Sequence, residues 1–161
     1  MVMEPLIAVH AIAASFVLTL GIVQLLRRRR DAAHRLLGRT WAAAMLVTCL
    51  TSFAIHPHGF SWLHGLALFT LASVTAGIVA IRRGNVRSHR ANMTGSYIGT
   101  AVAFAFAAPT PQRAIARLAV TGPGELALAA LLIAATSAAL VTIVVSLVAG
   151  RRRKGAPARV A

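Results

Sequence analysis

Four histidines occupy repeated positions in this chain. His10 and His64 each lie early in a long apolar run and are 54 residues apart, while His34 and His89 each precede an arginine and are 55 residues apart. A neutral imidazole binds haem iron, relays protons and forms hydrogen bonds. An ionisable side chain in a membrane segment is costly, which makes a functional role the first hypothesis. We call His10 and His64 the outer pair, and His34 and His89 the inner pair.

Four uses of these histidines are compatible with the sequence. Each pair could ligate a haem iron, and two haems would carry electrons across the bilayer. The outer pair could instead join His56 and His58 of the segment HPHG in a metal site near the outer face. The imidazoles could relay protons or accompany a solute. Finally, the inner pair could serve only to contact lipid phosphates, and the outer pair only to bond across helices.

The sequence contains no recognisable catalytic constellation. It has 3 acidic residues and one cysteine, Cys49, which lies inside an apolar run. A Ser-His-Asp pattern, a Walker loop and a glycine-rich dinucleotide fingerprint are all missing from the sequence. A single cysteine excludes a disulfide within the chain and a cysteine-based metal site. Whether the chain is an enzyme therefore stays open at this point.

The composition indicates an integral membrane protein. The 161 residues are 58% hydrophobic and only 12% charged, and their mean hydropathy is +0.75. Soluble domains carry about 25% charged residues. A water-soluble chain of this length could not bury so much apolar surface, so the lipid bilayer is the expected partner.

Five apolar runs have the length of transmembrane helices. A helix needs about 20 residues to cross about 30 Å of hydrocarbon, and lone strands cannot satisfy their backbone groups in lipid. We therefore predict an all-α bundle with five transmembrane helices in a single domain over residues 1–150. The predicted helices cover about residues 5–26, 34–56, 61–82, 89–108 and 124–149. Residues 151–161 are predicted to be a disordered basic tail, and PQRAIARLAV either a short surface helix or a plain loop.

The positive charges are confined to alternate connections. The formal net charge is +14, and 15 of the 17 Lys and Arg residues fall on one side of the membrane if the chain crosses five times. Because cytoplasmic loops are enriched in Lys and Arg, the predicted location is the bacterial inner membrane, with the N-terminus outside and the C-terminus in the cytoplasm. Charges placed around membrane-length runs in this way exclude nucleic acid as a partner and favour anionic lipid headgroups.

The first and second apolar runs resemble the third and fourth in sequence. In each of these two halves an intramembrane histidine is followed by Gly-Ile-Val, beginning at Gly21 or Gly77, then by arginines and by the His-Arg pair. The similarity predicts a four-helix core built from a duplicated helical hairpin. If the first helix faces the third, the outer pair meets, and if the second faces the fourth, the inner pair meets.

Helical spacing predicts which face of each helix points inward. Residues spaced by three or four positions share one face, and small or weakly polar residues suit helix contacts in lipid. The four predicted faces are His10, Ala14, Val17, Gly21 and Gln24; His34, Gly38, Trp41, Met45, Thr48 and Ser52; His64, Leu68, Leu71 and Thr75; and His89, Met93, Ser96, Thr100, Ala103 and Ala107.

The segments HRLLGR and SHRANM, together with the intramembrane histidines, resemble a family of bacterial predicted membrane proteins of unknown function. The resemblance spans His10 to Ala108 and implies an integral membrane protein without implying a substrate. The topology is similar, more distantly, to two-haem transmembrane cytochromes b. That similarity implies that the outer pair and the inner pair would each hold a haem b.

The sequence hypothesis is therefore a haem-b electron carrier that uses His10 with His64 and His34 with His89 as iron ligands. Its partners would be a quinone or a soluble redox protein. The alternative is a non-catalytic membrane protein, either a small transporter or a subunit of a complex, whose histidines are structural or relay protons. The sequence does not specify the oligomeric state.

Overall fold

The computed structural model describes residues 3–27, 30–55, 59–109 and 114–154, and all regular structure within these ranges is α-helical. This confirms the predicted all-α class. The six helices are α1 (Met3–Leu26), α2 (Ala32–Ala54), α3 (Trp62–Arg82), α4 (Val86–Ala107), α5 (Ala114–Thr121) and α6 (Pro123–Lys154).

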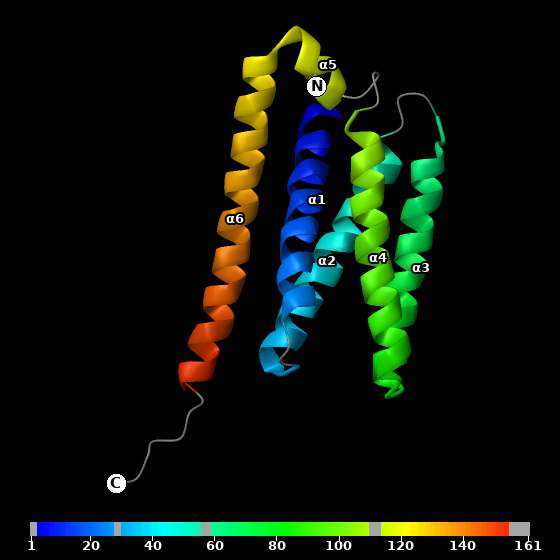
Figure 1. The fold of residues 1–161 in the computed structure, drawn as a ribbon, viewed down its shortest axis with the longest axis vertical. Helices are drawn as coiled ribbons and strands as arrows, with labels where there is room; N and C mark the ends of the chain where they lie inside the picture. The colour runs from blue at the N-terminus through cyan, green and yellow to red at the C-terminus, as the bar shows by residue number, and fades with distance from the viewer. Residues whose placement is uncertain (1–2, 28–29, 56–58, 110–113, 155–161) are drawn as a thin grey trace.

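Five long helices run up and down along the longest axis, and the short helix α5 lies across one end (Figure 1). The α1–α2 and α3–α4 connections and the C-terminal end of α6 lie at the opposite end. We call this second end the basic end, because eight described arginines flank its two connections. These are Arg27, Arg30, Arg35, Arg39, Arg82, Arg83, Arg87 and Arg90.

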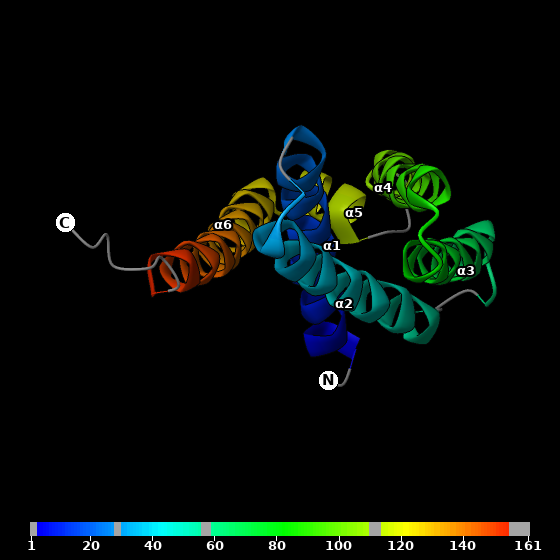
Figure 2. The same cartoon turned by 90° about the horizontal axis from the view of Figure 1, so that it is seen from below.

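The first four helices pack as a closed ring. α1 contacts α2 and α4, and α3 also contacts α2 and α4, whereas the described backbones of α1 and α3, and of α2 and α4, are not in contact. The helices that carry each histidine pair therefore stand diagonally across a four-helix core. α6 lies outside this core against α1 and α2, on the side away from α3 (Figure 2).

Local sequence signals explain where the helices begin. The Asp31 carboxylate accepts a hydrogen bond from the His34 amide at 3.1 Å, and the Asn85 side chain accepts one from the Ser88 amide at 2.9 Å. Each bond satisfies an amide that the first turn of a helix leaves free. Gly84, with φ of 77°, makes the tight turn between α3 and α4 that a residue with a side chain would adopt only with strain.

Four helices are long and apolar enough to cross a membrane, namely residues Pro5–Leu26, Ala32–Ala54, Trp62–Arg82 and Pro123–Leu147. The sequence predicted five, and α4 is the helix that does not meet this criterion of length and composition. Its first two turns carry Arg87, His89, Arg90 and Asn92, which lower its mean apolarity. α4 nevertheless packs against α3 as its antiparallel neighbour (Figure 1).

The inward faces predicted for α1, α2 and α4 are confirmed, because every member of these three sets is buried or half-buried. The prediction for α3 holds for His64, which is buried, and for Leu71, which is half-buried. It is wrong for Leu68, which is 54% exposed, and for Thr75, which is also exposed. The buried residues of α3 are His64, Ala67, Thr70, Val74, Gly77 and Ala80. Apart from His64, these residues are all smaller than leucine, and small residues allow neighbouring helices to approach closely.

Two terminal features differ in extent from the prediction. The segment left open as a helix or a loop forms the amphipathic helix α5 over Ala114–Thr121. α6 continues to Lys154, so residues 151–154 of the predicted tail are helical. Arginine and lysine are good helix formers, which explains why α6 does not end at Gly150. Residues 155–161 lie outside the described residues.

Candidate functional site

The inner pair lies at the basic end, in the first turns of α2 and α4. His34 is within electrostatic range of His89 and of the guanidinium groups of Arg27, Arg30 and Arg35. Both imidazoles are half-buried. Residues from the α1–α2 connection, α2 and α4 thus form one cluster, although they are far apart in the sequence.

The ring orientation of His89 is fixed by α3. Its Nδ1 lies 2.9 Å from the Gly77 carbonyl oxygen. A carbonyl oxygen can only accept, so Nδ1 carries the proton, and in the neutral ring Nε2 retains its lone pair. Gly77 suits this contact, because a Cβ there would displace the flexible end of Met93 and press on Asn92. His89 therefore presents a basic nitrogen from a ring that is anchored at its other nitrogen.

Buried polar atoms around His34 lack partners among the described residues. They are His34 Nδ1, Gln24 Oε1 and Arg27 Nε. The Gln24 side chain approaches closely, since its Nε2 donates to the His34 carbonyl oxygen at 3.1 Å. Buried polar atoms in proteins are nearly always hydrogen-bonded, so three unsatisfied atoms at one corner indicate a place where a bound group would be stabilised.

The outer pair has different hydrogen-bond partners from the inner pair. His10 Nδ1 lies 2.9 Å from the Thr51 hydroxyl, which joins α1 to α2. His64 Nδ1 accepts a hydrogen bond from the Ser61 amide at 2.9 Å, and this bond caps α3. Since Nδ1 accepts, the neutral His64 ring carries its proton on Nε2.

His64 is also enclosed by aromatic rings. It is only 5% exposed, and it stacks on Phe53 and Phe60 with ring centroids 5.9 and 5.0 Å away. Two phenylalanine rings and the Ser61 amide are therefore partners of the His64 ring. Its observed role is to begin α3 and to fill the interface with α2.

Two histidines of the alternative metal site at the outer face, His56 and His58, lie outside the described residues. Within the part of the chain that the structure describes, no three His, Cys, Asp or Glu side chains gather closely enough to hold a metal ion. This finding does not concern a haem with two histidine ligands, because the porphyrin supplies the remaining ligands to iron.

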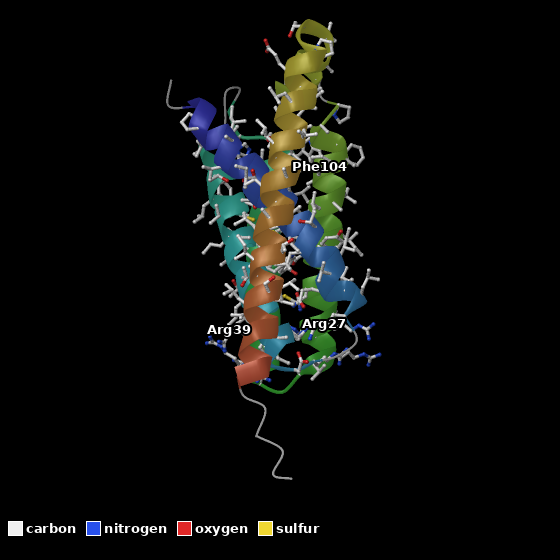
Figure 3. All side chains as sticks on the ribbon, turned by 90° about the vertical axis from the view of Figure 1, so that its left-hand side faces the viewer. Arg27, Arg39 and Phe104 are labelled. Atoms are coloured by element: carbon white, nitrogen blue, oxygen red, sulfur yellow. The ribbon has the colours of Figure 1, made fainter. Side chains whose placement is uncertain are left out.

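The basic end has few acidic groups to neutralise it. Among the described residues one ion pair is found, between Arg27 and Asp31 at 3.1 Å. Guanidinium nitrogen atoms gather at this end of the molecule, as the positions of Arg27 and Arg39 show, whereas Phe104 lies towards the other end (Figure 3). The inner pair therefore lies in a strongly positive environment.

Sequence reasoning placed Gln24 and Ser96 on inward faces but assigned them no role. Gln24 is the polar residue nearest the basic end of the α1 face, and its position inside an apolar run is the signal that could have singled it out. Ser96 is 1% exposed, and its hydroxyl has no partner in the described structure. The Gly77 carbonyl could not have been found, because backbone acceptors leave no mark in the sequence.

The family model described as "Predicted membrane protein (DUF2306)" matches residues 7–149 of the chain. No curated protein and no solved structure matches the chain.

Proposed function

The chain belongs to this family of membrane proteins, and from that premise we propose that it is an electron carrier that binds one haem b between His34 and His89. The observation that carries the proposal is the state of the inner pair. His89 offers Nε2 from an anchored ring. His34 interacts electrostatically with His89, and its buried Nδ1 has no partner among the described residues.

The anchoring of His89 suits a metal ligand. A histidine that binds a metal usually donates its other N–H to a carbonyl or a carboxylate, which fixes the tautomer and makes the free nitrogen more basic. The bond from His89 to the Gly77 carbonyl has this form. Because α2 and α4 stand diagonally across the core, His34 and His89 would hold the group from two different helices.

The arginines near His34 fit the carboxylates of a haem group. A bound haem would supply one-electron redox chemistry. Guanidinium groups form strong hydrogen bonds with carboxylates, and Arg27, Arg30 and Arg35 lie close enough to act on His34. Of these, Arg27 and Arg35 would hold the haem propionates. The redox partner implied at this end is a quinone or a soluble protein.

We limit the proposal to one haem. His64 accepts a hydrogen bond at Nδ1 and therefore carries a proton on Nε2, which leaves the ring without a free lone pair for iron. His10 bonds to Thr51 of the neighbouring helix. These contacts support a structural role for the outer pair.

The proposal includes five membrane crossings, with α4 as the fifth. α4 has 22 residues, equivalent to about 33 Å of helix, and it lies antiparallel to α3. Its polar first turns would lie at the headgroup level of the cytoplasmic leaflet. In this arrangement two similar hairpins form the core of a protein of the bacterial inner membrane, with the N-terminus outside and the C-terminus in the cytoplasm.

A visible spectrum tests the haem proposal. The full chain, produced with ample haem and purified in detergent, is expected to show a Soret band that shifts on reduction with dithionite and a split α/β pair. His34→Ala and His89→Ala should each abolish this spectrum. His64→Ala is the matched control and should retain it. A wild-type protein without these bands, or a spectrum lost only in the outer-pair variant, would overturn the proposal.

A second candidate function rests on the unsatisfied atoms of Gln24, Arg27 and His34, which could hold water or a solute instead of haem. In that case the inner pair would relay protons. A featureless visible spectrum, together with proton uptake into proteoliposomes that His34→Ala abolishes, would favour this second function.

A further inference from the structure

A recess opens on the outer side of α4 at the basic end. Its volume is about 600 Å³, within the range of about 300–1,000 Å³ that small-molecule sites occupy. It is lined by Arg30, Val86, Arg87, Arg90, Ala91, Thr94 and Gly95. The recess is open at its side, and it does not include either imidazole of the inner pair.

No carboxylate among the described residues pairs with the arginines of the recess. All three of its arginines are exposed, and Asp31, the acidic residue described at this end, is paired with Arg27. Three guanidinium groups without described carboxylate partners favour an anion, and phosphate is one of the anions whose geometry arginine matches with two parallel hydrogen bonds.

The face of α4 that continues from the recess towards the C-terminal end of the helix is largely apolar and exposed. Ala91, Thr94, Ile98 and Val102 follow Arg87 at helical spacing, so they share its face, and Ile98 and Val102 are 54% and 44% exposed. The helix rises about 16 Å over the eleven steps from Arg87 to Ile98, which is about the depth of one leaflet. One surface therefore presents positive charge at headgroup depth and apolar side chains at acyl-chain depth.

We infer that this recess is a binding site for one anionic phospholipid of the leaflet at the basic end. Arg30, Arg87 and Arg90 hold the phosphate, and an acyl chain lies along Ile98 and Val102. Basic pockets of transmembrane helices are known to select anionic headgroups. The inference goes beyond the haem proposal and does not depend on it, since the recess excludes the inner pair.

Native mass spectrometry of the full chain in detergent tests the site. The probes are phosphatidylglycerol, phosphatidylcholine and inorganic phosphate. The wild type should retain phosphatidylglycerol in preference to phosphatidylcholine. The double variant Arg87→Gln/Arg90→Gln should lose affinity by about tenfold or more, as expected when two basic groups near an anionic headgroup are removed.

Two further variants make the result decisive. Arg82→Gln/Arg83→Gln removes two exposed arginines from the same end but outside the recess, and it should leave the affinity within about twofold, because screened surface charges contribute little. Gly95→Phe fills the recess without changing its charge, and a Cβ at Gly95 meets no atom within 4 Å. It should displace the lipid while the helical circular dichroism stays unchanged.

Three outcomes would overturn the inference. Equal loss in both arginine variants would mean that the whole basic end attracts lipid without a site. Equal retention of phosphatidylcholine would mean that charge does not select the ligand. Displacement of phosphatidylglycerol by inorganic phosphate at millimolar concentration would identify a site for free anions. None of these results would alter the visible spectrum, so the haem proposal stands or fails separately.

Discussion

The four histidines of this chain differ in their nearest hydrogen-bond partners, and these partners determine what each imidazole can do. A carbonyl fixes the proton of His89 on Nδ1, whereas an amide fixes the proton of His64 on Nε2. One residue type at repeated positions therefore yields a ring that offers a lone pair and a ring that does not. The sequence repeat predicted equivalent residues, and the hydrogen bonds distinguish them.

The bond between His10 and Thr51 is expected to stabilise the α1–α2 hairpin. Thr51→Val should lower the free energy of unfolding by about 0.6 kcal/mol, the typical strength of a hydrogen bond between transmembrane helices. Thr40→Val is the matched control, because the Thr40 hydroxyl donates only to Leu36 of its own helix among the described contacts. Reversible denaturant unfolding in detergent measures both. Equal losses in the two variants would show that the interhelical bond contributes nothing.

At the scale of helices, close packing depends on one glycine. The side chain of Tyr97 from α4 lies directly over Gly21 of α1, and the buried Trp41 indole of α2 donates to the Val17 carbonyl at 3.0 Å. Three helices of the ring therefore meet within one turn of α1. This contact secures α4, which has a smaller interface with α1 than with α3.

Gly21→Ala should consequently destabilise the bundle by about 1–3 kcal/mol, because the added methyl group collides with the Tyr97 ring and overpacks the contact. Gly99→Ala on α4 is the control. A Cβ at Gly99 meets nothing within 4 Å, so this substitution should be neutral or stabilise α4 through its higher helix propensity. Thermal unfolding followed by circular dichroism compares them. A Gly21→Ala protein as stable as the Gly99→Ala protein would refute the assigned packing.

The sequence predicted the helices and the inward faces of α1, α2 and α4, because polar and small residues recur there at helical spacing. On α3 it predicted that Leu68 is buried, but the smaller Ala67 occupies the buried position beside it and Leu68 is exposed. The sequence could not reveal that His64 caps α3 or that His89 bonds to Gly77. Both contacts depend on a backbone group whose position is defined only once the chain has folded.

At the scale of the whole molecule, positive charge is concentrated at one end of the long axis, whereas the helices pack side by side across that axis. The eight arginines that define the basic end lie at one end of the long axis, whereas the ring of α1 to α4 and the outer helix α6 are arranged across it. A buried Ser137 attaches α6 to this ring through a 3.1 Å hydrogen bond with Thr19. Much of the remaining surface of α6 is apolar, as expected for a helix that faces lipid.

The axial separation of charge leads to a prediction about orientation that also decides whether α4 crosses the membrane. In a Cys49→Ala background, single cysteines would replace Phe60, Arg83 and Val120. Phe60 and Val120 are 74% and 84% exposed, and Arg83 is exposed in the turn after α3. A membrane-impermeant maleimide applied to intact bacterial cells should label positions 60 and 120, whereas position 83 should react only after permeabilisation.

This pattern follows from the positive-inside rule when α4 is the fifth span, because the end that holds Phe60 and α5 then faces outward. If α4 does not cross, position 120 should be protected together with position 83. If the orientation is reversed, position 83 should be the one labelled in intact cells. Each cysteine variant must retain wild-type thermal stability, because unfolding would expose all three positions and remove the contrast between them.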